Sequence, residues 1–139
     1  MRLAILALAA GASCLGAAAI AARTSPLTTP PPASGTGLSH AECFQPYEIW
    51  NRTIADDQTL LLNVDGRGTY RLTMKGRCLT NTSQYTDPIS ARGLRGAYSR
   101  ICKPTDLKVT AARGRPCFVD SIAKMPAEEV AALPKKYQP

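Results

Sequence analysis

Two runs of alternating apolar residues, 59–64 and 69–75, constrain the fold of this chain more than any other feature. Such alternation predicts half-buried strands, and the short glycine-rich turn between the runs predicts an antiparallel hairpin. The apolar faces coincide if residues 66–68 form the loop and Gly68 adopts the left-handed conformation. In that register the pairs would be Val64 with Tyr70, Leu62 with Leu72, and Leu60 with Met74. Because a lone hairpin is marginal in water, other segments must cover the apolar face.

Further short strands separated by glycine and proline turns follow from the same pattern. We expect strands within 43–50, within 89–102, over 107–111 and over 117–122, and a helix over 126–133. A proline at the helix start and acidic residues in its first turn favour this helix. The fold class is therefore expected to be mainly β: a small antiparallel β-barrel or sandwich of about five to six strands with one short C-terminal helix.

Large apolar side chains in these segments are expected in the core. Trp50, the sole tryptophan, is assigned a packing role, with a ligand platform as the alternative. On the last strand, Phe118 and Ile122 would share the core face, and Val119 would lie on the other.

The amino terminus predicts export. A positive start, an apolar run and small residues up to position 22 are typical of a bacterial signal peptide, with cleavage after Ala21 or Ala22. The alternatives are lipidation of Cys14 after cleavage at a lipobox, and a retained membrane anchor. Residues 23–41 are expected to form a Pro/Gly/Ser/Thr-rich linker, residues 42–134 the folded domain, and residues 135–139 a loose tail.

Four cysteines remain when the signal segment is removed: Cys43, Cys78, Cys102 and Cys117. An even number in a small exported domain predicts two disulfides, for which three connectivities exist. We favour Cys78 with Cys102 and Cys43 with Cys117. The chain has no C-x-x-C, and its single histidine, His40, lies in the linker, so we expect no metal site and no cofactor.

The formal net charge of +7 predicts anionic neighbours. After export these would be lipid headgroups, lipopolysaccharide or acidic envelope polymers rather than cytoplasmic nucleic acid. The candidate anion-binding residues are Arg92, Arg95, Arg100, Arg113 and Arg115. The alternative is that these arginines only keep the surface soluble.

No catalytic residues are assigned. An enzyme would have to draw on Asp56, Asp57, Asp87, Asp106 or Asp120. Paired carboxylates are the usual means of glycoside hydrolysis, so the competing hypothesis is a hydrolase or glycan-active enzyme with two of them in one cleft.

Several short motifs resemble those of a family of small exported proteobacterial proteins, many from sphingomonad-like groups, classed as a domain of unknown function. The motifs are Cys43-Phe44, residues 56–60, Tyr70-Arg71-Leu72, Gly76-Arg77-Cys78, Arg100-Ile101-Cys102, Cys117 with Ile122, and residues 126–129. The resemblance implies export, an envelope location and a compact cysteine-bonded domain, and it brings no activity.

The expected function is a non-enzymatic binding or structural module of the periplasm or secreted fraction. Its partner would be an envelope protein or an anionic envelope polymer, with membrane attachment only through a lipid anchor or an uncleaved signal. A membrane-anchored lipoprotein is the alternative location. An inhibitor or chaperone-like partner of a periplasmic enzyme is a further alternative function.

Overall fold

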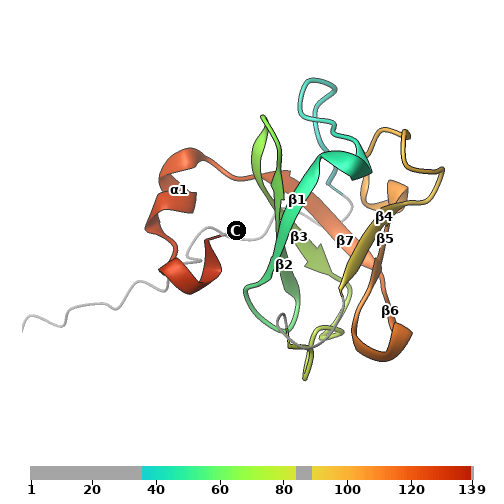
Figure 1. Cartoon of the computed structure of the whole chain (residues 1–139), viewed down its shortest axis with the longest axis vertical. Coiled ribbons are helices and arrows are strands. Elements are labelled where there is room, and N and C mark those ends of the chain that lie inside the picture. Colours follow the sequence, from blue (N-terminus) through green and yellow to red (C-terminus); the bar gives the residue numbers. More distant parts are fainter. Residues whose placement is uncertain (1–35, 84–88, 139) are drawn as a thin grey trace, which may run out of the picture.

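A computed structural model describes residues 36–83 and 89–138 of the chain (Figure 1). The fold is mainly β and consists of two antiparallel sheets, consistent with a sandwich-like arrangement. In strand order, the first sheet contains β1 (Ile49–Ile54), β2 (Thr59–Val64), β3 (Gly68–Met74) and β7 (Val119–Lys124). The second contains β4 (Ser90–Gly93), β5 (Leu107–Thr110) and β6 (Pro116–Cys117).

Short helical segments connect and flank the strands. The only α-helix among the described residues is α1 (Ala127–Ala132), which begins after Pro126 and confirms the helix expected at 126–133. The 3-10 turns are η1 (Pro46–Glu48), η2 (Pro104–Asp106), η3 (Ala112–Gly114) and η4 (Lys135–Tyr137). Within the described part of the chain, no helix is long and apolar enough to cross a membrane.

The predicted hairpin is present as β2 and β3, but the predicted register is wrong by two residues. Leu62 lies opposite Tyr70, and Val64 lies opposite Gly68. The loop is 65–67, closed by a hydrogen bond from the Arg67 amide to the Val64 carbonyl (3.0 Å). Gly66 and Gly68 both have positive φ, at 65° and 96°, so each supplies a conformation that other residues adopt at a cost. Moving the loop by one residue shifts the register by two, and the apolar faces therefore still coincide.

One face of this hairpin forms the main core, as predicted. Its six apolar side chains are almost completely buried: Leu60, Leu62, Val64, Tyr70, Leu72 and Met74. They pack against residues of the second sheet such as Val109 and against Phe44 and Ile101, whose backbones pair outside the named strands. Each side chain of this size contributes about 1.5–3 kcal/mol when buried.

The other face of the hairpin is covered by α1. Leu61 packs there with Met125 and Leu133 in a separate small cluster. Arg71 is also buried on this face and forms an ion pair with Glu129 of the helix. A buried guanidinium needs such a partner because an unpaired charge in the interior is costly. The helix therefore shields a charge as well as an apolar surface.

The four cysteines form two disulfides, as predicted, but the favoured pairing is wrong. Cys43 is bonded to Cys102, and Cys78 is bonded to Cys117, with Cα–Cα distances of 4.7 and 5.7 Å. The first bond lies beside the Phe44–Ile101 bridge, where backbone pairing brings the two segments together. Spacing in the sequence does not contain this information. Such bonds are typical of proteins in oxidising compartments.

Two aromatic residues assigned to the core are on the surface. Pairing between β1 and β2 shifts register between Ile49 and Asn51, as at a β-bulge, so Trp50 has no cross-strand partner and is 82% exposed. A second register shift in β7, beside Asp120, turns Val119 inward together with Ile122. Phe118 is exposed as a result.

The predicted linker and tail both contain residues that contact the domain. The Leu38 amide donates to the Cys102 carbonyl (2.7 Å), and the Ile122 amide donates to the Thr36 carbonyl (3.1 Å). In the tail, Tyr137 packs on the small cluster beneath α1. The signal segment, Cys14 and most of the predicted linker lie outside the described residues, as do residues 84–88.

Candidate anion-binding site

The structure divides the five candidate arginines between the two ends of the sheets (Figure 1). Arg92, Arg95 and Arg100 lie on β4 and the loop that follows it. Arg113 and Arg115 lie in the turn between β5 and β6, at the opposite end. The five arginines therefore belong to two separate basic regions, whereas the sequence analysis grouped them as one set of candidates.

Arg113 and Arg115 line one pocket of about 420 Å³. The other lining residues are Thr80, Asn81 and Ala112, and we call the pocket formed by these five residues the basin. It combines two guanidinium groups with a hydroxyl and an amide, and none of its five residues is acidic. Both arginines were predicted as candidates from the sequence. Thr80 and Asn81 were not predicted, and they come from a different loop.

The Cys78–Cys117 disulfide holds the two sides of the basin together. It joins the segment that leads to Thr80 and Asn81 to the segment that follows Arg115. The Arg115 guanidinium also donates to the Thr80 carbonyl (3.2 Å), which fixes one arginine across the basin. The position of the basin therefore depends on a covalent bond as well as on the burial of neighbouring residues such as Leu79 and Ala111.

The basin has an unusual backbone. Asn81 and Arg113 have φ of 57° and 58°, and they are the only non-glycine residues with positive φ in the described part of the chain. Asparagine tolerates this conformation, whereas for arginine it costs on the order of 1 kcal/mol or more. Strain of this kind is concentrated at functional sites, so Arg113 is placed in the basin at a cost to stability.

Guanidinium groups bind carboxylates, sulfates and phosphates through charge-assisted hydrogen bonds. The basin holds two of them beside hydroxyl and amide groups that add neutral hydrogen bonds. It suits an anionic group carried by a larger molecule, because its open, polar surface offers little apolar contact to a small free ligand.

The arginines at the other end are less concentrated. Arg100 donates to the His40 carbonyl (2.9 Å), so this arginine also ties the chain upstream of Cys43 to the domain. Arg92 lies near Arg52 of β1. Burial, and then repulsion by Arg92, lower the pKa of Arg52. Two arginines close enough to repel one another indicate a locally positive surface.

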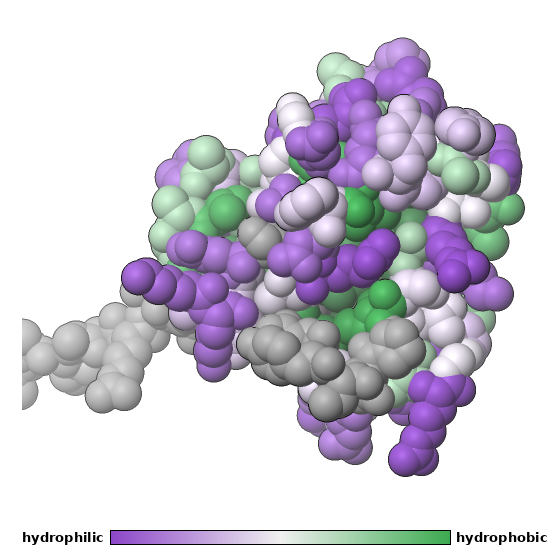
Figure 2. Space-filling view, in the orientation of Figure 1, coloured by the Kyte–Doolittle hydropathy of each residue, from purple (hydrophilic) through white to green (hydrophobic). Residues whose placement is uncertain are grey.

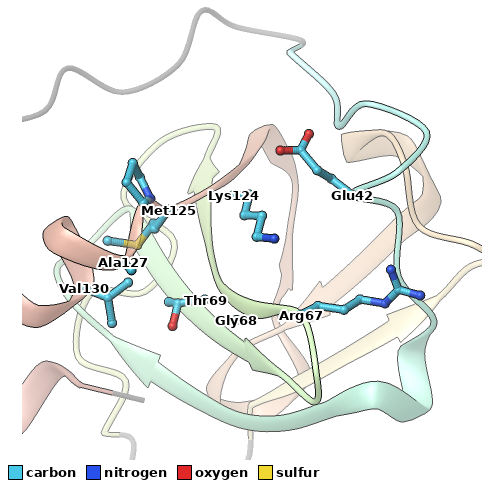
Figure 3. A pocket seen from close by; sticks show the side chains of 9 residues that line it. Glu42, Arg67, Gly68, Thr69, Lys124, Met125, Ala127 and Val130 are labelled. Atoms are coloured by element: carbon cyan, nitrogen blue, oxygen red, sulfur yellow. The ribbon is translucent and has the colours of Figure 1, made fainter.

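A larger pocket, of about 640 Å³, lies between the hairpin loop and α1 (Figure 3). Charged side chains, Glu42, Arg67 and Lys124, border one part of it. Apolar side chains, Met125, Ala127 and Val130, border the part next to the helix. The sequence did not predict this pocket, because its residues come from three separate segments with no shared motif.

The charges of this pocket are largely committed to neighbours. Hydrogen bonds from the Ser39 hydroxyl (2.6 Å) and amide (3.1 Å) lower the pKa of Glu42. Arg67 is paired with Glu48 (3.3 Å). The pocket has the volume of a small-molecule site, but its mixed charge does not select one class of ligand.

Of the aspartates in the competing enzyme hypothesis, the four that the structure describes line neither pocket: Asp56, Asp57, Asp106 and Asp120. Asp57 is paired with Arg77, Asp56 accepts from the Gln58 amide (2.8 Å), and Asp106 accepts from the Cys102 and Lys103 amides (3.1 and 3.0 Å). Asp120 is half-buried on β7, and Asp87 lies outside the described residues. The local roles of Asp56 and Asp106 are those of turn and cap residues.

Within residues 36–83 and 89–138, no group of three or more histidine, cysteine, aspartate or glutamate side chains is arranged to hold a metal ion. No protein-family model, no curated protein and no solved structure matches this chain.

Proposed function

We propose that this protein is a non-enzymatic binding module of the bacterial envelope, which attaches to an anionic envelope polymer through the basin. The single observation that carries the proposal is that Arg113 and Arg115 line one pocket, with one of them held in a strained backbone conformation. A glycine at position 113 would relieve this backbone strain. The presence of arginine there instead favours a role for its side chain.

The location of the protein is part of the same proposal. Two disulfides are typical of an oxidising compartment, and the signal-like amino terminus would direct the chain to the periplasm or beyond. Membership of the exported proteobacterial family that the sequence resembles would fit this location. Lipidation at Cys14 would add a membrane anchor to the same module.

Replacing Arg113 with glycine tests the role of the basin directly. Glycine adopts positive φ freely, so Arg113→Gly should raise the free energy of unfolding by about 1 kcal/mol or leave it unchanged. The same variant should weaken binding to a soluble anionic polymer on the order of tenfold, because it removes one of two guanidinium groups. Calorimetric titration with alginate and with polyphosphate, together with urea unfolding, measures both quantities.

The matched control is Arg95→Gly, which removes the same charge from the other end of the molecule. It should affect polymer binding less than threefold, because Arg95 lies outside the basin. Equal losses for the two variants would indicate non-specific charge attraction and would refute the basin as the site. Unaltered binding by the Arg113 variant, or no binding of either polymer by the natural protein, would refute it as well.

A further inference from the structure

Four large exposed side chains are carried by η1, the start of β1 and the loop after β4. They are Tyr47, Trp50, Leu94 and Tyr98, exposed by 62, 82, 60 and 83%, and we call them the aromatic face. The rings of Tyr47 and Tyr98 are in contact, with centroids 5.9 Å apart. Figure 2 shows side chains of intermediate and high hydropathy interleaved with hydrophilic ones over this end of the molecule.

The two segments that carry the aromatic face are fixed against each other. A side chain at Gly93 would bring its Cβ within 2.7 Å of the Pro46 ring, so only glycine permits this approach. The Leu94 amide donates to the Asp106 carbonyl (2.9 Å), which anchors the start of the loop. The exposure of Leu94 and Tyr98 therefore belongs to a defined loop conformation rather than to a loose end.

The exposure of Trp50 also has a local cause. The register shift at the start of β1 leaves Trp50 without a partner on β2, and bulges of this kind redirect a side chain. Leaving a tryptophan, two tyrosines and a leucine in water forgoes the stabilisation that burial would provide. Grouped exposed side chains of this type mark interaction surfaces.

The surroundings of the aromatic face are positively charged. Arg92 and Arg95 are exposed and have no ion pair within the described residues, and no acidic residue occurs from 93 to 103. Two carboxylates on the neighbouring turns are engaged: Glu48 binds Arg67 and the Gln45 amide, and Asp106 binds backbone amides of the η2 turn. Asp65, whose amide donates to the Glu48 carbonyl (2.8 Å), is exposed and belongs to none of the ion pairs of the described residues. Among these groups, the two unpaired arginines therefore outnumber the one unpaired carboxylate.

From this combination we propose that the aromatic face docks on an anionic lipid surface. Tryptophan and tyrosine prefer the boundary between water and hydrocarbon, and arginines beside them attract acidic headgroups. The contact is made by the folded domain, so it differs from a lipid anchor or an uncleaved signal. It is also separate from the basin, which lies at the other end of the sheets.

Two details favour a lipid surface over a polysaccharide. Leu94 has no ring on which a sugar could stack, but an aliphatic side chain on a loop enters the acyl boundary readily. The Tyr47 and Tyr98 rings are inclined at 60° to each other and do not form a continuous flat platform. An acidic polysaccharide would therefore use the charges here but only part of the apolar surface.

Trp50 provides the measurement because it is the only tryptophan in the chain. When vesicles of phosphatidylcholine and phosphatidylglycerol are added to the natural protein, its emission should shift to shorter wavelength and become protected from aqueous acrylamide. Vesicles of phosphatidylcholine alone should produce a much smaller shift. This signal reports on the aromatic face itself, even if the amino terminus also attaches to the vesicle.

Charge-matched variants separate this proposal from the one on the basin. Arg92→Gln with Arg95→Gln should lower the apparent affinity for acidic vesicles on the order of twentyfold, since each arginine near such a surface contributes roughly fivefold. Arg113→Gln with Arg115→Gln should leave the Trp50 shift unchanged. A third variant, Leu94→Ser with Tyr98→Ser, should reduce protection from acrylamide without altering the net charge.

Three results would overturn the proposal. The first is Trp50 emission that acidic vesicles leave unchanged, and the second is equal loss of the shift in both double-arginine variants. The third is a shift produced by alginate but not by vesicles, which would assign the face to a polysaccharide. Because the readout is Trp50 rather than polymer binding, failure here leaves the basin proposal standing, and failure of the basin leaves this one standing.

Discussion

Two pairs of aromatic rings have opposite environments, although their first members, Phe44 and Tyr47, are only three residues apart in the chain. Phe44 and Tyr70 are fully buried, with centroids 4.7 Å apart. Tyr47 and Tyr98 are in contact at 5.9 Å but lie in solvent. The two pairs have similar ring geometry, so ring contact alone does not distinguish a core from a surface.

The difference lies in what surrounds each pair. Phe44 follows Cys43, and its backbone exchanges hydrogen bonds with Ile101 (3.2 and 2.7 Å) beside the Cys43–Cys102 disulfide. Tyr47 lies in a short 3-10 turn that leads into the bulge at Trp50. One pair is enclosed by two sheets and a covalent bond, whereas the other is carried by two turns. The same residue class therefore supports stability in one place and leaves a surface free for binding in the other.

Truncating one member of each pair should show the largest contrast. Phe44→Ala should lower the free energy of unfolding by about 3–5 kcal/mol, because it leaves a cavity in the main core. Tyr47→Ala should change it by about 0.5 kcal/mol or less, since the ring is exposed. Urea unfolding of both variants measures the contrast, and a similar loss in the two would mean that the exposed pair is part of the core.

Removing the disulfides should have the next largest effect and sharpen the comparison. Replacing Cys43 and Cys102 with serine should cost about 2–4 kcal/mol, and so should replacing Cys78 and Cys117, because the closed loops are of similar length. The second double variant should in addition weaken polymer binding at the basin, whereas the first should not. Chemical unfolding and polymer titration distinguish these outcomes, and identical binding by the two variants would contradict them.

The smallest effect concerns the hydroxyl of the buried pair. Burial raises the pKa of Tyr70, whose hydroxyl donates to the Glu42 carbonyl (2.8 Å). The folded state thus retains this proton more tightly than the unfolded chain does. The contribution of the Tyr70 hydroxyl to the free energy of unfolding is complete below the unfolded pKa of about 10. It is lost as pH rises through the folded pKa.

Tyr70→Phe should therefore lower the free energy of unfolding by about 1 kcal/mol near neutral pH and make its decline above pH ~10 shallower. Tyr98→Phe is the matched control, because its ring is exposed, and it should change the free energy of unfolding near neutral pH by about 0.5 kcal/mol or less. Urea unfolding from neutral to alkaline pH measures both, and equal slopes for the natural protein and the Tyr70 variant would refute this role.

Much of the fold could be predicted from local patterns. Strict alternation placed the six apolar residues of the hairpin on one face, and the proline and glutamates at 126–129 predicted the helix. The register could not be chosen in the same way, because Gly66 and Gly68 both permit a turn and both registers keep the apolar face intact. The alternating pattern determines which side chains face the core. It does not distinguish two registers that differ by two residues.

The errors occur where the chain departs from regular pairing. The register shifts that expose Trp50 and turn Val119 inward cannot be predicted from the order of apolar residues in the sequence. Disulfide pairing has the same difficulty, because three connectivities fit the spacing and only the Phe44–Ile101 bridge selects the observed one.

The candidate site was predictable only in part. Basic residues around Gly114 identified Arg113 and Arg115, since charge is visible in a sequence. Their convergence with Thr80 and Asn81 depends on the disulfide between Cys78 and Cys117, and therefore on the pairing that the sequence left open. The separation of the arginines into two regions depends on the direction of β4 and β5 and could not be read from composition.

The order of the two sulfur bridges along the chain has a consequence for resistance to proteases. The loop closed by Cys43 and Cys102 overlaps the loop closed by Cys78 and Cys117. A protease that cuts once anywhere between positions 43 and 117 therefore releases no fragment, because at least one bridge spans every such cut. A nicked molecule would migrate as a single species on a gel until thiols are added, and it could keep its ligand while its backbone is already broken.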